Sequence, residues 1–295
     1  MQLEIVPLQD TELSEAWRIC NLAFGTFLNV PDPSKTFGDR DLLSPRFRSG
    51  CAELLAARAG GRLIGSVVAT RWGSFGFFGP LTVLPEYWDQ GIAKSLLEET
   101  VRVFERWGVR HSGLFTFPHS AKHIGLYQKF GYWPQYLTAI MKKTPQPGGD
   151  CELYSGSKAA EHAARELTDA ISPGLDLTAE IRAASGTVLV QTRGILDAFA
   201  VCHTGPGSEG GSGVCYVKFG AARSGEAFEK LLDACEAFAA QRGAVIEAGV
   251  NLARVDAYRR MRARGYRTVT QGVAMQRPHD PGFNRTDVYV IDDWR

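Results

Sequence analysis

A helix that begins at a glycine directly after an apolar strand carries the clearest chemical signal in this chain. Residues 81–84 are typical of the end of a buried strand, and residues 85–90 form a proline-broken loop before a helix that starts near Gly91. The first N–H groups of a helix have no partner within it, so such a start can bind a phosphate. Glycine lets the backbone approach the anion, and the helix dipole favours its charge. We therefore expect a phosphate-bearing cofactor at this loop.

The first half of the chain predicts the alternating elements that would position this loop. Apolar patterning predicts strands near 3–8, 52–58, 62–71, 76–84, 114–117 and 136–141, and helices near 11–24, 91–107 and 120–130. The apolar residues of the helix at 91–107 recur on one face, which predicts packing against a sheet. A run rich in Pro and Gly at 144–150 is the clearest linker, so a domain boundary is expected there.

The second half repeats the first at a spacing of 134 residues. The matched pairs include Val83 with Val217, Gly91 with Gly225, Ala93 with Ala227, Leu97 with Leu231, and Gly131-Tyr132 with Gly265-Tyr266. A duplicated α/β unit explains so many matches in one phase better than two unrelated segments of similar length do. A chain of 295 residues also accommodates two domains, which we place at 1–146 and 151–295.

Composition narrows the class of protein. A hydrophobic content of 44% and a charged content of 22% are typical of a globular protein with a sizeable core. A net charge of +1 gives no electrostatic reason to expect nucleic acid or an acidic membrane as the partner. With no membrane-spanning apolar run, no signal peptide and six scattered cysteines, a cytoplasmic protein with reduced thiols is expected. The glycine-rich run at 205–213 predicts a mobile loop.

Two motifs together resemble the GCN5-related N-acetyltransferase (GNAT) family. The family's cofactor loop follows a Gln/Arg-x-x-Gly-x-Gly/Ala pattern, which residues 88–93 match at Gly91 and Ala93, with Trp88 in the first slot. A second family pattern, roughly Asn-x-x-Ala-x-x-Leu-Tyr-x-Lys-x-Gly-Phe, follows about thirty residues later. Residues 120–132 match it at Leu126, Tyr127, Lys129 and Gly131, have Tyr132 for Phe, and depart from it at Ser120 and His123. The resemblance covers about 50–143, and 185–278 more weakly.

The resemblance implies an acetyl-CoA-dependent acyltransferase with an α/β fold, in which a mixed sheet is flanked by helices, as two tandem GNAT-like domains. It places the pantetheine arm of acetyl-CoA along the strand before the loop, at Thr82, Val83 and Leu84. The pyrophosphate falls on the loop and helix start, and the residues assigned to the cofactor are Asp89, Gln90, Gly91, Ile92, Ala93, Lys94, Ser95 and, further on, Ser120. Lys94 adds a cation there or is a solvated helix lysine. Asp89 repels phosphate, or else caps the helix.

Transfer of an acetyl group to an amine needs a polarised carbonyl, a neutral amine and an acid for the leaving thiolate. The resemblance gives Tyr127 the role of general acid; the alternative is a tyrosine that only packs by its ring. Strand N–H groups near Val83 could polarise the carbonyl. The general base is open between His119, Glu53, Glu86 and a water-mediated route, and His119 is our assignment. His119 and His123 lack the third ligand of a zinc site, so no metal is expected.

The second copy lacks two features of the first. At the spacing of 134, Ile92 corresponds to Glu226 and Tyr127 to Met261. A glutamate opposes phosphate binding and a methionine cannot donate a proton, so we expect this half to be degenerate and to shape the acceptor cleft or replace a dimer partner. The acceptor is a small-molecule or peptide amine, and the protein is a monomer or homodimer. A non-catalytic acyl-CoA sensor or interaction module is the alternative.

Overall fold

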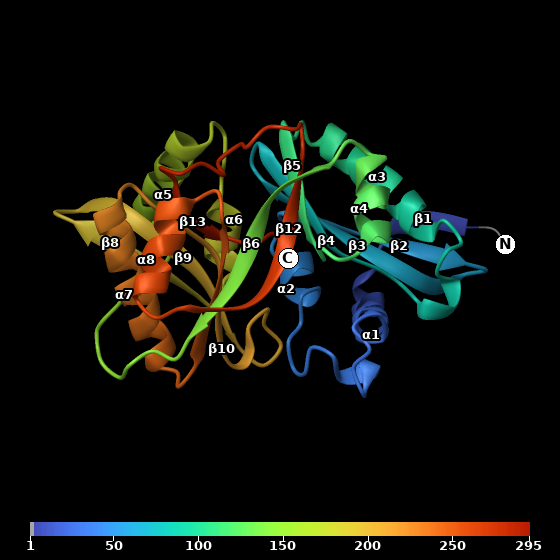
Figure 1. The fold of residues 1–295 in the computed structure, drawn as a ribbon, viewed down its shortest axis with the longest axis horizontal. Coiled ribbons are helices and arrows are strands. Elements are labelled where there is room, and N and C mark those ends of the chain that lie inside the picture. Colours follow the sequence, from blue (N-terminus) through green and yellow to red (C-terminus); the bar gives the residue numbers. More distant parts are fainter. Residues whose placement is uncertain (1–2) are drawn as a thin grey trace.

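The chain forms two consecutive series of strands and helices, which Figure 1 shows as two lobes joined by one sheet. The computed structural model describes residues 3–295. The first series comprises β1 (Leu3–Pro7), η1 (Asp10–Glu12), α1 (Leu13–Phe27), η2 (Pro33–Lys35), α2 (Ser44–Arg48), β2 (Ala52–Ala59), β3 (Arg62–Trp72), β4 (Phe75–Val83), η3 (Pro85–Tyr87), α3 (Ile92–Arg106), β5 (His111–Thr116), α4 (Ala121–Gln128) and β6 (Trp133–Lys143). All the elements expected in this half are confirmed to within a few residues.

The second series follows the same order of elements. It comprises β7 (Glu152–Leu153), α5 (Lys158–Ile171), α6 (Thr178–Ala183), β8 (Gly186–Thr192), β9 (Ile195–Gly205), β10 (Gly211–Ala222), α7 (Gly225–Ala240), β11 (Val245–Asn251), α8 (Val255–Ala263), β12 (Arg267–Arg277) and β13 (Tyr289–Asp292). The expected duplication is therefore present in the fold, with β13 added at the end. β6 and β12 show the duplication most clearly, because their first residues and their last residues are both 134 positions apart.

The two series exchange their last strands. β6 pairs antiparallel with β11, β12 pairs antiparallel with β5, and β6 and β12 pair with each other in the middle (Figure 1). The sheet order is β1-β2-β3-β4-β5-β12-β6-β11-β10-β9-β8-β7, with β13 beside β10. Each half of the sheet is thus completed by a strand from the other half. The boundary between 1–146 and 151–295 stays a prediction, and three strand pairings join the two ranges within the sheet, namely β5 with β12, β12 with β6, and β6 with β11.

Hydrophobic packing joins the halves as well. One core cluster lies mainly within the first half and also includes Val273 and Met275 of β12, and a second lies mainly under α7. A third combines β3 and β4 aromatic residues with residues of the second series, among them Trp72, Phe75, Phe77, Leu175, Phe199, Phe219 and Trp294. Burying large aromatic side chains contributes strongly to stability, so this third cluster holds the two series as one unit.

The constant spacing fails at one place, in β10. Directly after the bulge, Val67 of β3 pairs with Leu81 of β4, and Val201 of β9 pairs with Phe219 of β10 in the same position of the second copy. Two residues further on, Val83 therefore corresponds to Ala221, and the predicted match of Val83 with Val217 is wrong. The cause is a redistribution of residues. The connection from strand to helix shrinks from residues 84–91 in the first copy to 223–224 in the second, while β10 is longer.

The glycine-rich run at 205–213 is packed rather than loose, so the prediction of a mobile loop is wrong. Ser208, Glu209, Gly210 and Gly211 are buried. The backbone of this run bonds to the first half, with Gly207 N donating to Asp39 O at 2.8 Å and Asp41 N donating to Ser208 O at 3.0 Å. A Cβ at Gly210 would lie 2.2 Å from the His203 carbonyl oxygen. Gly210 is therefore required because another part of the backbone approaches it closely, and not because the loop is flexible.

Candidate active site

An opening between β4 and β5 lies where the predicted site residues meet. These neighbouring parallel strands pair only at Phe75–Phe77 with His111–Gly113. A bulge follows at once, because the β3–β4 register shifts between the pairs Ala69–Phe78 and Val67–Leu81. Bulges bend a strand and end its regular pairing, so β4 diverges from β5 beyond Phe78. The divergence leaves one backbone edge of β4 available to a ligand.

Strand alternation identifies the backbone groups on that edge. The N–H of Leu84 donates to the Ile64 carbonyl oxygen of β3 at 2.8 Å, so Leu84 faces β3. Successive residues of a strand point their backbone groups to opposite neighbours, so the N–H groups of Leu81 and Val83 face the opening. The Val83 carbonyl is already engaged, since the Trp88 indole N–H donates to it at 2.7 Å. This bond accounts for a tryptophan in the first slot of the loop motif.

Thr82 adds a polar side chain beside this edge. Its side chain is buried, and its hydroxyl is among the buried polar atoms without a hydrogen-bond partner in the described residues. An orphaned buried hydroxyl is costly unless a further molecule satisfies it. The amides of a pantetheine arm would suit this hydroxyl and the adjacent N–H groups, so this strand fits the group the sequence predicted there.

The loop ends in an uncapped helix start. Gly91 is the N-cap of α3, adopts a left-handed φ of +80°, and α3 has no side-chain cap. The Ser95 N–H bonds to the Gly91 carbonyl oxygen at 3.1 Å, which leaves Ile92, Ala93 and Lys94 with the N–H groups that α3 itself cannot satisfy. These groups and the positive end of the helix dipole suit a phosphate.

The two charged residues of the loop have different surroundings from those expected. Asp89 is not the helix cap; it is exposed, has φ of +64°, and forms an ion pair of 2.5 Å with Lys122 of α4. Lys122 thereby neutralises the carboxylate that would oppose phosphate. The Lys94 ammonium lies 3.4 Å from Glu98 one turn along an exposed helix face. Gln90 is exposed, and its amide donates to the Glu86 carbonyl oxygen at 3.2 Å.

Tyr127 lies between the two diverging strands. Its ring packs edge-on against Phe78 of β4, with centroids 5.7 Å apart. Burial raises the pKa of its hydroxyl to about 12, and a hydrogen bond with Thr116 of β5 partly offsets that rise. The tyrosine therefore packs by its ring and also presents a neutral O–H next to the end of β5. Both readings of this residue from the sequence are compatible with this placement.

The structure separates the candidate bases. His119 is exposed and its ring stacks on Phe27 of α1 at 6.0 Å, while burial lowers the pKa of nearby His123. Glu53 is paired with Arg106 at 2.9 Å and Glu86 with Arg62 at 3.3 Å, so both glutamates lie in surface ion pairs.

Ser120 has a structural role in the described residues. It is the N-cap of α4, and its hydroxyl accepts from the His123 N–H at 3.4 Å. It therefore fixes the start of the helix that carries Tyr127. Whether its hydroxyl also contacts the cofactor stays a prediction.

The equivalent opening of the second copy is filled by the chain itself. β10 and β11 pair over Val214–Val217 and then diverge, but β13 pairs with the next part of β10 from Phe219 to Ala222. The start of α7 is also satisfied, because the Ser224 side chain caps it by accepting from the Ala227 N–H at 3.2 Å. The second copy thus has neither an open strand edge nor an uncapped helix start after β10.

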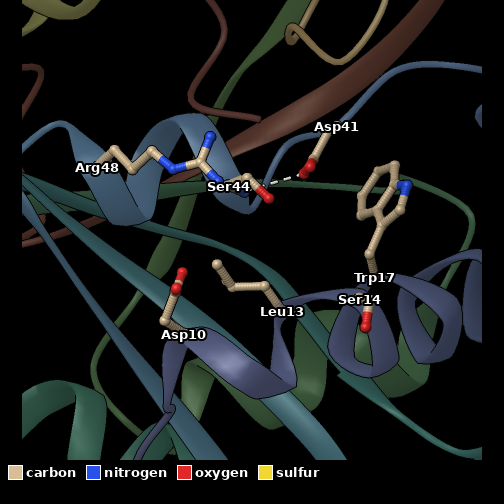
Figure 2. Close-up of a pocket in the computed structure, with 7 residues that line it drawn as sticks. All are labelled: Asp10, Leu13, Ser14, Trp17, Asp41, Ser44 and Arg48. Atoms are coloured by element: carbon tan, nitrogen blue, oxygen red, sulfur yellow. Dashed lines mark hydrogen bonds between the residues drawn. The ribbon is translucent and has the colours of Figure 1, made fainter.

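Figure 2 shows a cavity elsewhere on the first half, between the start of α1 and α2. Its volume is about 440 Å³, and it is lined by Asp10, Leu13, Ser14, Trp17, Asp41, Ser44 and Arg48. None of the predicted site residues lines it. The opening between β4 and β5 therefore remains the site at which transfer chemistry is expected.

Comparison with known proteins agrees with the duplicated fold. A putative acetyltransferase from Pyrococcus horikoshii has a TM-score of 0.71 at 17% identity, covering 99% of this chain and 95% of that one. A tandem GNAT protein from the clavulanic acid biosynthesis pathway has 0.58 at 12%, covering 95% and 100%. A GCN5-related N-acetyltransferase from Sphaerobacter thermophilus has 0.57 at 15%, covering 93% and 95%. A search of curated proteins by sequence found no match.

These likenesses define the class of fold: a tandem GNAT fold of mixed α/β type, as predicted. Residues 16–132 match the model of the acetyltransferase (GNAT) family, so this part of the first half is a GNAT domain. This match supports N-acetyltransferase activity. Within residues 3–295, no helix is long and apolar enough to cross a membrane, and no cluster of His, Cys, Asp and Glu is arranged to hold a metal ion.

Proposed function

We propose that the first half binds one acetyl-CoA in the opening between β4 and β5 and transfers its acetyl group to a primary amine of a small molecule or peptide. The observation that carries the proposal is the coincidence of a free strand edge at Leu81 and Val83 with the uncapped start of α3 at Gly91. The strand edge would pair with the pantetheine arm, and the helix start with the pyrophosphate.

The reaction on these residues is direct attack. The neutral amine attacks the thioester carbonyl carbon, while an N–H group of the β4 edge stabilises the oxygen that gains negative charge. The carbon–sulfur bond then breaks, and Tyr127 donates its proton to the departing CoA thiolate. The amine loses a proton to His119 or, through water, to solvent. Tyr127 regains its proton from solvent, so the balance closes on acetylated amine and CoA.

The second half is proposed to be degenerate toward acetyl-CoA. β13 occupies its strand edge, and Ser224 caps its helix start. The second half still completes the sheet through β12 and packs against the first half. Both contributions are the same in a monomer and in a homodimer. We retain 1–146 and 151–295 as the two domains, with their final strands exchanged.

Calorimetric titration of the full chain tests the proposal. We expect one acetyl-CoA bound per chain, and CoA release when amines, amino acids or aminoglycosides are screened with a thiol reagent. Binding at two sites of similar affinity per chain would contradict the degenerate second half. Tight binding with no CoA release with any amine would favour the acyl-CoA sensor instead.

Gly91→Ala tests the helix start. A left-handed residue with a Cβ costs about 1–2 kcal/mol, so this residue is expected to leave its conformation and displace the N–H groups behind it. We expect the Kd for CoA to rise about tenfold or more, measured by calorimetry. Gly108→Ala is the matched control, because Gly108 follows the other end of α3 with φ of +64° and likewise has open space around a Cβ. An equal loss of CoA affinity in both variants would rule out a specific role for Gly91.

A further inference from the structure

A chain of buried charges links the second half to the bulge of β4. Arg46 of α2 is 1% exposed and bonds to Glu209 through Nη2 at 2.6 Å. The other carboxylate oxygen of Glu209 accepts from the Lys218 ammonium at 2.6 Å, and Lys218 also donates to Glu180 at 2.9 Å. The indole N–H of Trp72 donates to Glu180 at 3.0 Å. Two cations and two carboxylates alternate, so this network is neutral overall.

One end of the network holds the backbone where the opening begins. Arg46 Nη1 donates to the Gly79 carbonyl oxygen at 2.7 Å. Gly79 lies in the β4 bulge, two residues after Phe77, where the pairing with β5 ends, and has φ of +146°. L-residues rarely adopt this region, so the bulge needs both a glycine and an anchor that keeps its carbonyl turned toward Arg46.

The second copy supplies the charges that hold Arg46. Lys218 lies between the β9–β10 pairs Val201–Phe219 and Cys202–Val217, which is the position that Gly79 shares in the β3–β4 bulge. The packed glycine-rich run inserts Glu209 between Arg46 and Lys218. Buried ion pairs therefore join the two equivalent bulges. At the bulge position the second copy contributes the Lys218 side chain, whereas the first copy has Gly79 and contributes its backbone carbonyl.

We propose that Arg46 is a positioning residue for acetyl transfer, and that Glu209 and Lys218 of the second half orient it. By fixing the Gly79 carbonyl, Arg46 sets the angle at which β4 leaves β5, and hence the position of the Leu81 and Val83 N–H groups relative to Tyr127. This inference rests on the proposed function for its effect on transfer. It gives the degenerate half a defined task, which is to hold the strand that carries the chemistry.

Arg46→Lys and Glu209→Gln test the proposal in the full chain. A lysine retains the positive charge but cannot bond to Glu209 and Gly79 in the same forked geometry. We expect kcat per folded molecule to fall about tenfold in each variant, using the amine that the wild-type chain acetylates fastest. The Kd for CoA should change less than kcat does, because the helix start at Gly91 is untouched although the strand edge at Leu81 and Val83 shifts. Amide hydrogen exchange of residues 77–84, measured without ligand, should become at least threefold faster.

Arg254→Lys is the matched control. Arg254 is fully buried and paired with Asp292 at 3.0 Å, but its contacts lie in the second half. It should lower stability and speed exchange near β13 without changing kcat or exchange at 77–84. Unchanged exchange at 77–84 in Arg46→Lys overturns the proposal, as does an unchanged kcat. A wild-type chain that acetylates no amine contradicts the proposed function alone, since the exchange rates still decide whether Arg46 holds the strand.

Discussion

Replacing Tyr127 with phenylalanine should lower kcat about 100-fold while leaving the Kd for CoA within about twofold. General acid catalysis contributes roughly 10²–10⁴-fold, and the leaving thiolate is the group that needs a proton here. The ring of Tyr127 packs on Phe78, and phenylalanine preserves that packing. The loss should therefore fall on turnover rather than on binding. CoA release with a thiol reagent gives kcat, and calorimetry gives the Kd.

Tyr132→Phe provides a closely matched control. Tyr132 also packs edge-on against Phe78, at 5.4 Å, and burial raises its pKa to about 12, as for Tyr127. Its hydroxyl, however, bonds to Ser112 at 3.0 Å at the paired end of β5. Removing it should cost about 1 kcal/mol of stability and leave kcat unchanged. If both variants lose activity equally, the loss reflects packing around Phe78 and Tyr127 is not the acid.

The pKa of Tyr127 also fixes the pH dependence of the wild-type rate. A group with a pKa of about 12 stays protonated, and so remains able to donate, throughout the neutral and mildly alkaline range. The wild-type kcat should therefore not decline between about pH 7 and pH 10 on account of this acid. A decline with a midpoint near pH 8 would mean that another group donates the proton.

Local patterns predicted the first half well because its strands and helices bury their faces locally. The periodic apolar residues of α3 and the glycine at Gly91 each encode a short-range structure, and both are in place. The spacing of 134 residues correctly indicated the duplication. This spacing did not predict the register of β10. The second copy has a longer strand and a shorter loop before the helix, so the total length of the two stays nearly constant.

Local sequence patterns do not predict which distant segments pair with one another. Nothing in residues 133–143 distinguishes a strand that pairs within its own half from one that pairs with β11. The segment from 289 to 292 likewise gives no local sign that it fills the second opening. The buried network was hidden for a related reason. Arg46, Glu209 and Lys218 look like surface charges in the sequence, and only their meeting across the interface makes burial tolerable.

That burial predicts a large loss of stability in Lys218→Met. Lys218 is 3% exposed, and the ammonium group faces Glu180, Glu209, Arg46 and the Cys51 thiol. Removing one partner of a buried ion pair leaves an uncompensated charge, which costs about 3–5 kcal/mol. Urea denaturation at pH 7 measures the loss. Lys230→Met makes the same change in an exposed pair with Glu226 and should cost at most about 0.5 kcal/mol.

The pH dependence separates lost charge compensation from simple loss of packing. Burial opposes ionisation of Glu180, but Lys218 outweighs it and holds the pKa of Glu180 below its ordinary value. A carboxyl group with a lowered pKa in the folded state contributes stability at a pH above the unfolded pKa of about 4.3. That stability is lost as the pH falls from there through the folded pKa. In Lys218→Met burial acts unopposed on Glu180, so its pKa rises and protonation now favours the folded state.

The stability difference between wild type and Lys218→Met should therefore shrink as the pH is lowered from 8 to 5. Glu209 keeps Arg46 and lies beside His203, whose pKa is lowered by burial, so Glu180 dominates this change. A cavity or packing defect would give a difference that is constant over the same range. Such constancy would show that Lys218 stabilises the fold through its packing and that its charge contributes nothing.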